Sequence, residues 1–262
     1  MGGKIMLMVV DIGNTNITVA LYSGKKMTDS YRLTTSFKRT SDEYGLLISD
    51  FLHHFGYENK DVADVIIASV VPKIMYSFTN SIRKYLHIEP IIVGPGIKTG
   101  IAIKIDNPRE MGADKIADAV GAYYNYGGNI IVCDFGTATT FDYINPSGEL
   151  IGGVIAPGIE ISAQALSNRA AKLPEIEIRN PKTVLAKNTI TSMQAGVVYG
   201  YIGQVEYIIK QMKKEIGIDN IKVVATGGLG RIIYEETDVI DTYDPKLTFE
   251  GLRIIYDRFK KC

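Results

Sequence analysis

Two stretches of this chain place an acidic residue at the end of an apolar run and follow it with glycine and small polar residues. The first reads VVDIGNTNIT at 9–18, and the second reads VCDFGTATT at 132–140. A tight glycine turn after a buried strand exposes backbone N–H groups in a concave loop, which suits phosphate oxygens. The carboxylate would repel phosphate, but it can hold a cation or its water shell, which then bridges to phosphate. We therefore predict a metal-holding acid and a phosphate cradle in each turn.

A purely structural alternative exists for either turn. The pattern Asp-x-Gly-Asn is also common hairpin-turn chemistry. Two matching turns at corresponding places in two halves of one chain favour the functional interpretation. The P-loop pattern is absent, and no G-x-G-x-x-G follows the first apolar run.

The elements that would position these turns alternate between strand-like and helix-like patterns, which predicts an α/β fold. The first half is expected to contain strands at 5–10, 17–22, 28–34, 65–71 and 91–93, and helices at 41–55, behind a Ser41 cap, and at 72–86. The second half repeats this order, with strands at 130–135, 139–144, 148–156 and 222–230, and helices at 157–168 and 191–217. We predict two similar lobes, residues 1–104 and 105–262, with a cleft between them.

Composition excludes several classes of function. Among 262 residues, Lys+Arg and Asp+Glu both number 29, so the basic excess of a nucleic-acid or anionic-membrane binder is missing. The apolar run at 5–10 is too short to span a bilayer. Two cysteines form neither a disulfide framework nor a metal pattern. We expect a cytoplasmic protein with no nucleic-acid or membrane partner.

Seven motifs together carry a family resemblance along nearly the whole chain. They are DIGNTN at 11–16, SVVP at 69–72, NPREMGADK at 107–115, DFGTATTFD at 134–142, GGVIAPG at 152–158, KNT at 187–189 with QAGVVYGYIGQVE at 194–206, and TGG at 226–228. The chain resembles type III pantothenate kinase, within the superfamily of acetate and sugar kinases, heat-shock chaperones and actin. The resemblance implies duplicated actin-like (ribonuclease H-like) lobes with a nucleotide cleft, and ATP-dependent phosphorylation of the terminal hydroxyl of pantothenate.

The resemblance also implies which residues bind ATP and cations. ATP would be bound by Asp11, Ile12, Gly13, Asn14, Thr15, Asn16, Ile17, Thr18 and Thr137. Asp11 would position Mg²⁺ through water, and Asp134 would bind a monovalent cation, K⁺ or NH₄⁺. Gly227 and Gly228 would approach the nucleoside, although a helix-starting turn is an alternative role for them.

Asp114 matches the family's catalytic base, and pantothenate would contact Gly112, Ala113, Asp114, Lys115, Ile105 and Thr189. Asn107-Pro108 is typical of a helix start, so Asp114 and Asp118 would share one helix face. Both acids also suit a helix N-terminus without any catalytic role. In the family, the residue at Thr189 reaches the neighbouring subunit's site, which implies a homodimer with its interface in the second lobe.

Two positions depart from the family pattern. Lys115 stands where Arg is usual, and Ile105 stands where an aromatic residue, usually Tyr, is common. These departures keep open a kinase of another small hydroxyl substrate on the same fold. A non-catalytic nucleotide-binding regulator is a further hypothesis, but the presence of both Asp11 and Asp114 disfavours it. An actin-like filament protein is another, but the chain is short for one.

The remaining reactive side chains point to ordinary structural roles. His53 and His54 have no acid or cysteine partner at ligand spacing, so we expect surface or packing roles for them. Cys133 lies in an apolar run and is expected to be inert core.

Overall fold

The computed structural model describes residues 5–261, which form two compact units. Unit 1 contains residues 5–101, 107–121 and 247–261, and unit 2 contains Ala102–Asp106 and Ala122–Lys246. The units therefore differ from the expected consecutive lobes 1–104 and 105–262, because the chain returns to unit 1 twice. None of the helices within 5–261 is long and apolar enough to cross a membrane.

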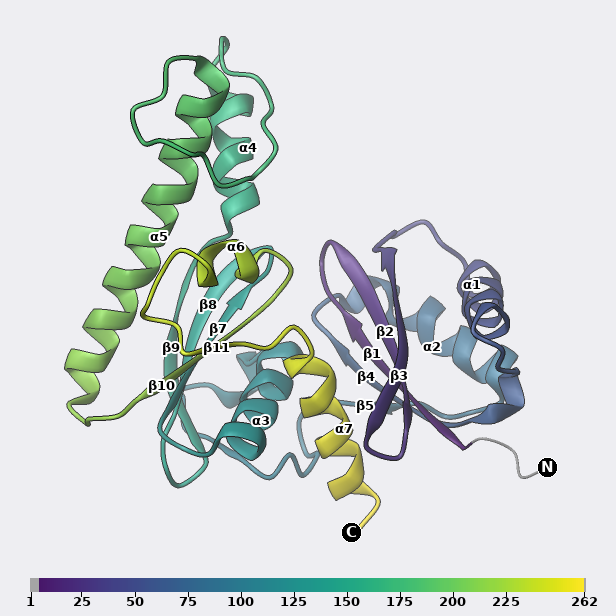
Figure 1. The fold of residues 1–262 in the computed structure, drawn as a ribbon. Coiled ribbons are helices and arrows are strands. Elements are labelled where there is room, and N and C mark those ends of the chain that lie inside the picture. Colours follow the sequence, from purple (N-terminus) through teal and green to yellow (C-terminus); the bar gives the residue numbers. More distant parts are fainter. Residues whose placement is uncertain (1–4, 262) are drawn as a thin grey trace. The chain divides into compact units, whose positions relative to one another are not determined.

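Unit 1 is built on a five-stranded sheet in the order β3-β2-β1-β4-β5 (Figure 1). Its strands are β1 (Met6–Ile12), β2 (Asn16–Ser23), β3 (Lys26–Thr34), β4 (Val62–Ser69) and β5 (Ile91–Ile92). β1 is antiparallel to β2 and parallel to β4, and it is buried along almost its whole length. β3 alternates between exposed and half-buried residues, as expected for an edge strand.

Two helices pack together beside this sheet, α1 (Ser41–His54) and α2 (Pro72–Leu86), with the short 3₁₀ helix η1 (Asn59–Asp61) after α1. Tyr44 and Phe78 of these helices share a core with Val10 and Ile67 of the strands. The predicted Ser41 cap is wrong by one residue. The N-cap is Thr40, because Glu43 reaches back to it and completes a capping box.

The C-terminal helix α7 (Leu247–Phe259) belongs to unit 1, where it contacts β1 and β4. Tyr256 donates a hydrogen bond to Asp64 of β4 over 2.6 Å, and Lys260 pairs with the same carboxylate at 2.9 Å. Thr248 donates to Asp118 of α3 (Ala113–Tyr126) over 2.6 Å. These contacts hold α7 in unit 1, although it follows the strands of unit 2 in the sequence.

Unit 2 repeats the strand order of unit 1, which confirms the predicted duplication. Its sheet runs β11-β10-β7-β8-β9-β6, so β9-β8-β7-β10-β11 corresponds to β3-β2-β1-β4-β5. β7 is antiparallel to β8 and parallel to β10, as β1 is to β2 and β4. The strands are β6 (Ala102–Ile103), β7 (Ile130–Phe135), β8 (Ala138–Ile144), β9 (Glu149–Pro157), β10 (Lys222–Thr226) and β11 (Thr242–Tyr243).

The helices of unit 2 are α4 (Ile159–Arg169), α5 (Thr189–Ile216) and α6 (Gly230–Tyr234). The two longest were predicted to within two residues at each end. α5 begins behind Asn188, whose side chain accepts from Thr191 N–H, and ends at Gly217 in the left-handed conformation with φ 66°. Val198, Tyr201 and Val205 of α5 pack into the second core with Phe141 and Val223 of the sheet.

Candidate active site

The first acid–glycine turn joins β1 to β2. Asp11 is the second-to-last residue of β1, and its Oδ1 atom is buried. The turn closes through a hydrogen bond from Gly13 N–H to the Asn16 carbonyl over 2.9 Å. Asn14 and Thr15 at the tip are exposed, and Thr18 is half-buried. The segment thus has the geometry of a hairpin turn, as the structural alternative predicted. The polar groups at its tip are nevertheless exposed and could contact a ligand.

Two residues of the predicted ATP set have buried side chains. Ile12 and Ile17 are both 0% exposed and lie opposite each other in the β1–β2 pair. Their side chains belong to the core of unit 1. Any contact with a nucleotide would therefore be made by their backbone.

The SVVP segment at the end of β4 lies beside this turn. Val70 N–H donates to the Ile12 carbonyl over 3.1 Å, which extends the β1–β4 pairing by one residue. The chain then enters α2 at Pro72, which tolerates the first helical position because it lacks an N–H. The SVVP segment therefore connects the end of β4, beside the first acid–glycine turn, to the start of α2.

Asp114 lies in the first turn of α3, and both its carboxylate and Val70 lie close to Gly112. A Cβ atom at position 112 would overlap Asp114 Oδ1 and would lie 3.3 Å from Cγ1 of Val70. Ile12, Val70, Gly112 and Asp114 therefore form a continuous series of neighbours within unit 1. The structure brings the predicted base to the same end of the sheet as the first turn.

The environment of Asp114 suits proton transfer. Burial raises the pKa of its carboxyl above the ordinary value, and the Lys115 N–H, which donates to Oδ1 over 2.7 Å, acts in the opposite direction.

The predicted helix start at Asn107-Pro108 is wrong. Residues Pro108–Glu110 form a separate 3₁₀ turn (η2), and α3 begins at Ala113.

Asp118 lies on the same helix as Asp114, but its side chain has a structural role. Its side chain is only 4% exposed and accepts a hydrogen bond from Thr248 of α7. The Asp118 side chain thus joins α3 to α7 within unit 1.

The second acid–glycine turn joins β7 to β8 at the corresponding place in unit 2. Asp134 is paired with Thr226 of β10, and Thr137 at the tip is exposed. Two glycines pack against this turn. A Cβ at Gly227, where φ is +90°, would lie 2.6 Å from the Phe135 backbone, and one at Gly158 would lie 2.6 Å from the Gly136 carbonyl. Only glycine fits at these two contacts.

The predicted site residues are divided between the two units. Asp11, Ala113, Asp114 and Lys115 lie in unit 1, whereas Ile105, Asp134, Thr137 and Thr189 lie in unit 2. Ile105 is half-buried, Gly228 has open space around it, and Thr189 is exposed at the first position of α5. In the part of the chain that the structure describes, no three His, Cys, Asp or Glu side chains could jointly hold a metal ion.

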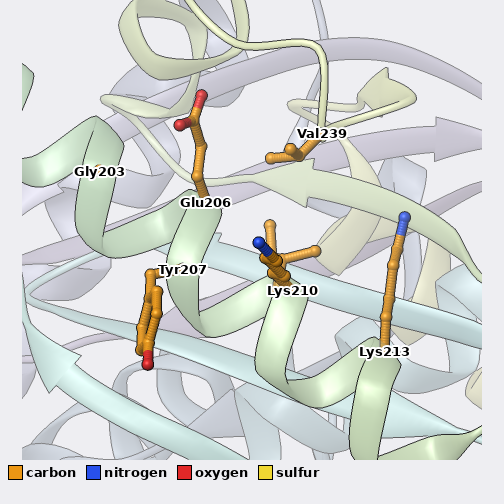
Figure 2. A pocket seen from close by; sticks show the side chains of 7 residues that line it. Gly203, Glu206, Tyr207, Lys210, Lys213 and Val239 are labelled. Atoms are coloured by element: carbon orange, nitrogen blue, oxygen red, sulfur yellow. The ribbon is translucent and has the colours of Figure 1, made fainter.

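A cavity of about 520 Å³ lies along α5 in unit 2 (Figure 2). Glu206, Lys210 and Lys213 extend from the helix beside Val239, and Glu206 accepts a hydrogen bond from Thr237 over 2.7 Å. None of the residues lining this cavity is a predicted site residue.

Comparison with known proteins identifies the family. The model of type III pantothenate kinase matches residues 7–211. A type III pantothenate kinase from Agathobacter rectalis is 55% identical over 251 residues, which are 96% of each chain. Another from Bifidobacterium adolescentis is 54% identical over 254 residues, covering 97% of this chain and 99% of its own. The chain belongs to the type III pantothenate kinase family.

Solved structures place this type III pantothenate kinase family member among more distant proteins of the same fold. A conserved protein assigned to the Baf family of transcriptional activators, from Campylobacter jejuni, has a TM-score of 0.60 at 20% identity, covering 97% of this chain and 100% of its own. Ethanolamine utilization protein EutJ from Carboxydothermus hydrogenoformans has a TM-score of 0.56 at 13% identity, covering 95% and 89%. At these identities the likeness concerns the fold alone.

Proposed function

We propose that this protein transfers the γ-phosphoryl group of ATP to the terminal hydroxyl of pantothenate, forming 4'-phosphopantothenate in the first step of coenzyme A biosynthesis. The observation that carries the proposal is the position of Asp114, a carboxylate with raised pKa, next to the segment that borders the first acid–glycine turn. Family membership supplies the identity of the substrate. A cytoplasmic location, where ATP is available, goes with this activity.

In this proposal Asp114 is the general base. Its carboxylate would accept the proton of the pantothenate hydroxyl as the oxygen attacks the γ-phosphorus. A base is most effective when its pKa approaches the working pH, and burial shifts the pKa of Asp114 in that direction. Gly112, Ala113 and Lys115 surround this carboxylate and are the proposed contacts with pantothenate, together with Ile105. The Lys115 ammonium would neutralise the carboxylate of pantothenate.

The two turns are the proposed phosphate-binding elements. Asp11 to Thr18 would bind the ATP phosphates through backbone N–H groups and the polar tip, and Thr137 would add a contact from unit 2. Among the described residues, no three His, Cys, Asp or Glu side chains gather around either acid to hold a metal ion, which fits cations whose other ligands are water and phosphate oxygens. Asp11 would hold Mg²⁺ through water, and Asp134 would hold K⁺ or NH₄⁺. When bound, these cations neutralise charge on the phosphates.

We further propose a homodimer that uses α5 as part of its interface. Gly196, Gly200 and Gly203 follow one another on one exposed face of this helix, and a Cβ at any of them would meet nothing within 4 Å. A helical glycine costs about 1 kcal/mol relative to alanine. Close approach of a second copy would explain why three such residues line one face. Thr189 at the start of α5 would then reach the partner's pantothenate site.

A coupled ADP-release assay, with and without pantothenate and in KCl or NaCl, tests the function. We expect turnover that requires pantothenate and is faster in KCl. Turnover that is independent of pantothenate, or absent in both salts, would contradict the proposal. Because Lys115 and Ile105 depart from the family pattern, turnover with other small hydroxyl compounds alone would indicate a kinase of different specificity.

A further inference from the structure

Thr35 makes two hydrogen bonds to the first acid–glycine turn. It follows the last residue of β3, its N–H donates to the Thr15 carbonyl over 2.9 Å, and its Oγ1 donates to the Gly13 carbonyl over 2.7 Å. Both acceptors lie within the segment that we propose to bind the ATP phosphates. Neither the motifs nor the residue spacing singled out Thr35, because the contact joins positions 22 residues apart.

These two bonds fix the direction of the turn's N–H groups. The described peptide bonds are all trans, so the carbonyl of one residue and the N–H of the next point in opposite directions. With the Gly13 and Thr15 carbonyls directed at Thr35, the N–H groups of Asn14 and Asn16 point away from it. Rotation of either peptide plane would break a bond to Thr35. The hydroxyl therefore holds the donors of the turn in one orientation before a ligand arrives.

The internal repeat provides a comparison within the same molecule. Thr35 pairs with Thr15 as Gly158 pairs with Thr137, since Asn16 lies opposite Thr34 and Ala138 lies opposite Pro157. Gly158 N–H also donates to the Thr137 carbonyl, over 3.2 Å. There is no room for a side chain at Gly158, so the second turn lacks the hydroxyl contact. The backbone bond is common to both turns, whereas the hydroxyl bond belongs to the first turn alone.

We propose that Thr35 is a positioning residue for the nucleotide, whose hydroxyl orients the Gly13–Asn16 turn and so sets the affinity for the ATP phosphates. The inference rests on the proposed function. It assigns Thr35 no contact with ATP itself, because its effect passes through the Gly13 and Thr15 carbonyls.

The test compares Thr35→Val, which keeps the shape and removes the hydroxyl, with Thr35→Ser, which keeps the hydroxyl. Thr28→Val is the matched control, because Thr28 lies on the same strand and donates to the Leu21 carbonyl over 3.3 Å, far along the strand from the turn. Calorimetry gives the Kd of ATP, and steady-state kinetics give the KM values for ATP and pantothenate. Calorimetry needs no turnover, so it separates this inference from the proposed activity.

We expect Thr35→Val to raise the Kd and KM of ATP by about tenfold, within the range for loss of one hydrogen bond. The pantothenate KM should change less than twofold, and Thr35→Ser and Thr28→Val should resemble the unmodified protein. An unchanged ATP Kd in folded Thr35→Val, or no recovery in Thr35→Ser, would overturn the inference. If the unmodified protein binds ATP but does not phosphorylate pantothenate, the proposed function fails, and the calorimetric comparison still decides the role of Thr35.

Discussion

Gly112 leaves free the space that the Asp114 carboxylate occupies. A Cβ at position 112 would overlap Oδ1 of Asp114 on one side and would approach Cγ1 of Val70 to 3.3 Å on another. The backbone N–H of Val70 donates to the Ile12 carbonyl, so moving the Val70 backbone away would break this bond. The position of the proposed base therefore depends on a residue that carries no side chain.

Gly112→Ala should displace the Asp114 carboxylate and lower kcat by about 10²-fold, since small errors in placement of a catalytic group carry penalties of that order. The Kd of ATP should change little, because the turn at Gly13 is untouched. Gly152→Ala serves as the control, because a Cβ there meets nothing within 4 Å. A Gly112→Ala protein with normal kcat would show that the Asp114 position is not critical.

Asp114→Asn should retain the fold and ATP binding, because the amide keeps the shape of the carboxylate. Loss of a general base lowers rates by about 10²–10⁴-fold, or roughly 3–5 kcal/mol of barrier. The measurement is kcat in the coupled assay, with Asp50→Asn, an exposed acid on α1, as the control. If the variant kept more than half the turnover, Asp114 would not be the base.

The pH dependence of kcat/KM follows from the same residue. The base acts only when ionised, so activity should fall as the pH drops through its pKa. Burial raises this pKa above that of an exposed aspartate, about 3.9. The acid limb should therefore appear at a higher pH than that value, and it should vanish from the residual activity of Asp114→Asn. An acid limb that persists in this variant would report a different group.

Asp134→Ala should abolish the dependence of activity on potassium and weaken ATP binding. A carboxylate at a strand end beside hydroxyl groups suits a hard cation. Titration of KCl at constant ionic strength, with NaCl making up the difference, isolates the specific effect. A variant with an unchanged potassium response would place the cation elsewhere.

Mixed dimers test whether Thr189 acts across the proposed interface. Thr189→Ala alone should raise the KM of pantothenate with little effect on that of ATP. A dimer of one Asp114→Asn chain and one Thr189→Ala chain should retain one intact composite site and about half the activity. If each site lay within one chain, the remaining activity of this mixed dimer would instead show the raised pantothenate KM of Thr189→Ala.

Lys115→Arg should lower the KM of pantothenate. Arg binds a carboxylate through two hydrogen bonds in a fixed plane, whereas Lys offers a point charge on a flexible stem. The KM of ATP is the internal control. A rise in the KM of pantothenate would indicate a pocket shaped around Lys115 for another substrate.

Features of the fold that depend on residues close in the sequence could be predicted, whereas those that depend on distant residues could not. The two acid–glycine turns and the duplicated strand order were predictable, because apolar runs and turn residues act locally. The short strands β6 and β11 and the helices α6 and α7 were missed. A two-residue strand exists only through its partner, and α7 is held in unit 1 by Tyr256 and Lys260 bonding to Asp64, 192 and 196 residues away.

The candidate site divides in the same way. The family motifs identified Asp11, Asp114 and Asp134 as residues of interest. The approach of Val70 to Gly112 and the hydrogen bond from Val70 to Ile12 depend on packing between separate segments, so residue spacing in the sequence could not predict them. The start of α3 was misplaced because Asn107-Pro108 caps a 3₁₀ turn, and Ala113 opens the helix.

Direct observation of the product tests the central claim. ³¹P NMR of ATP, Mg²⁺, KCl and pantothenate with the protein should show a phosphomonoester of pantothenate growing in step with ADP. Asp114→Asn should slow both signals together, and omission of pantothenate should abolish them. ATP consumption without that phosphomonoester, or no product from folded protein that binds ATP, would contradict the account.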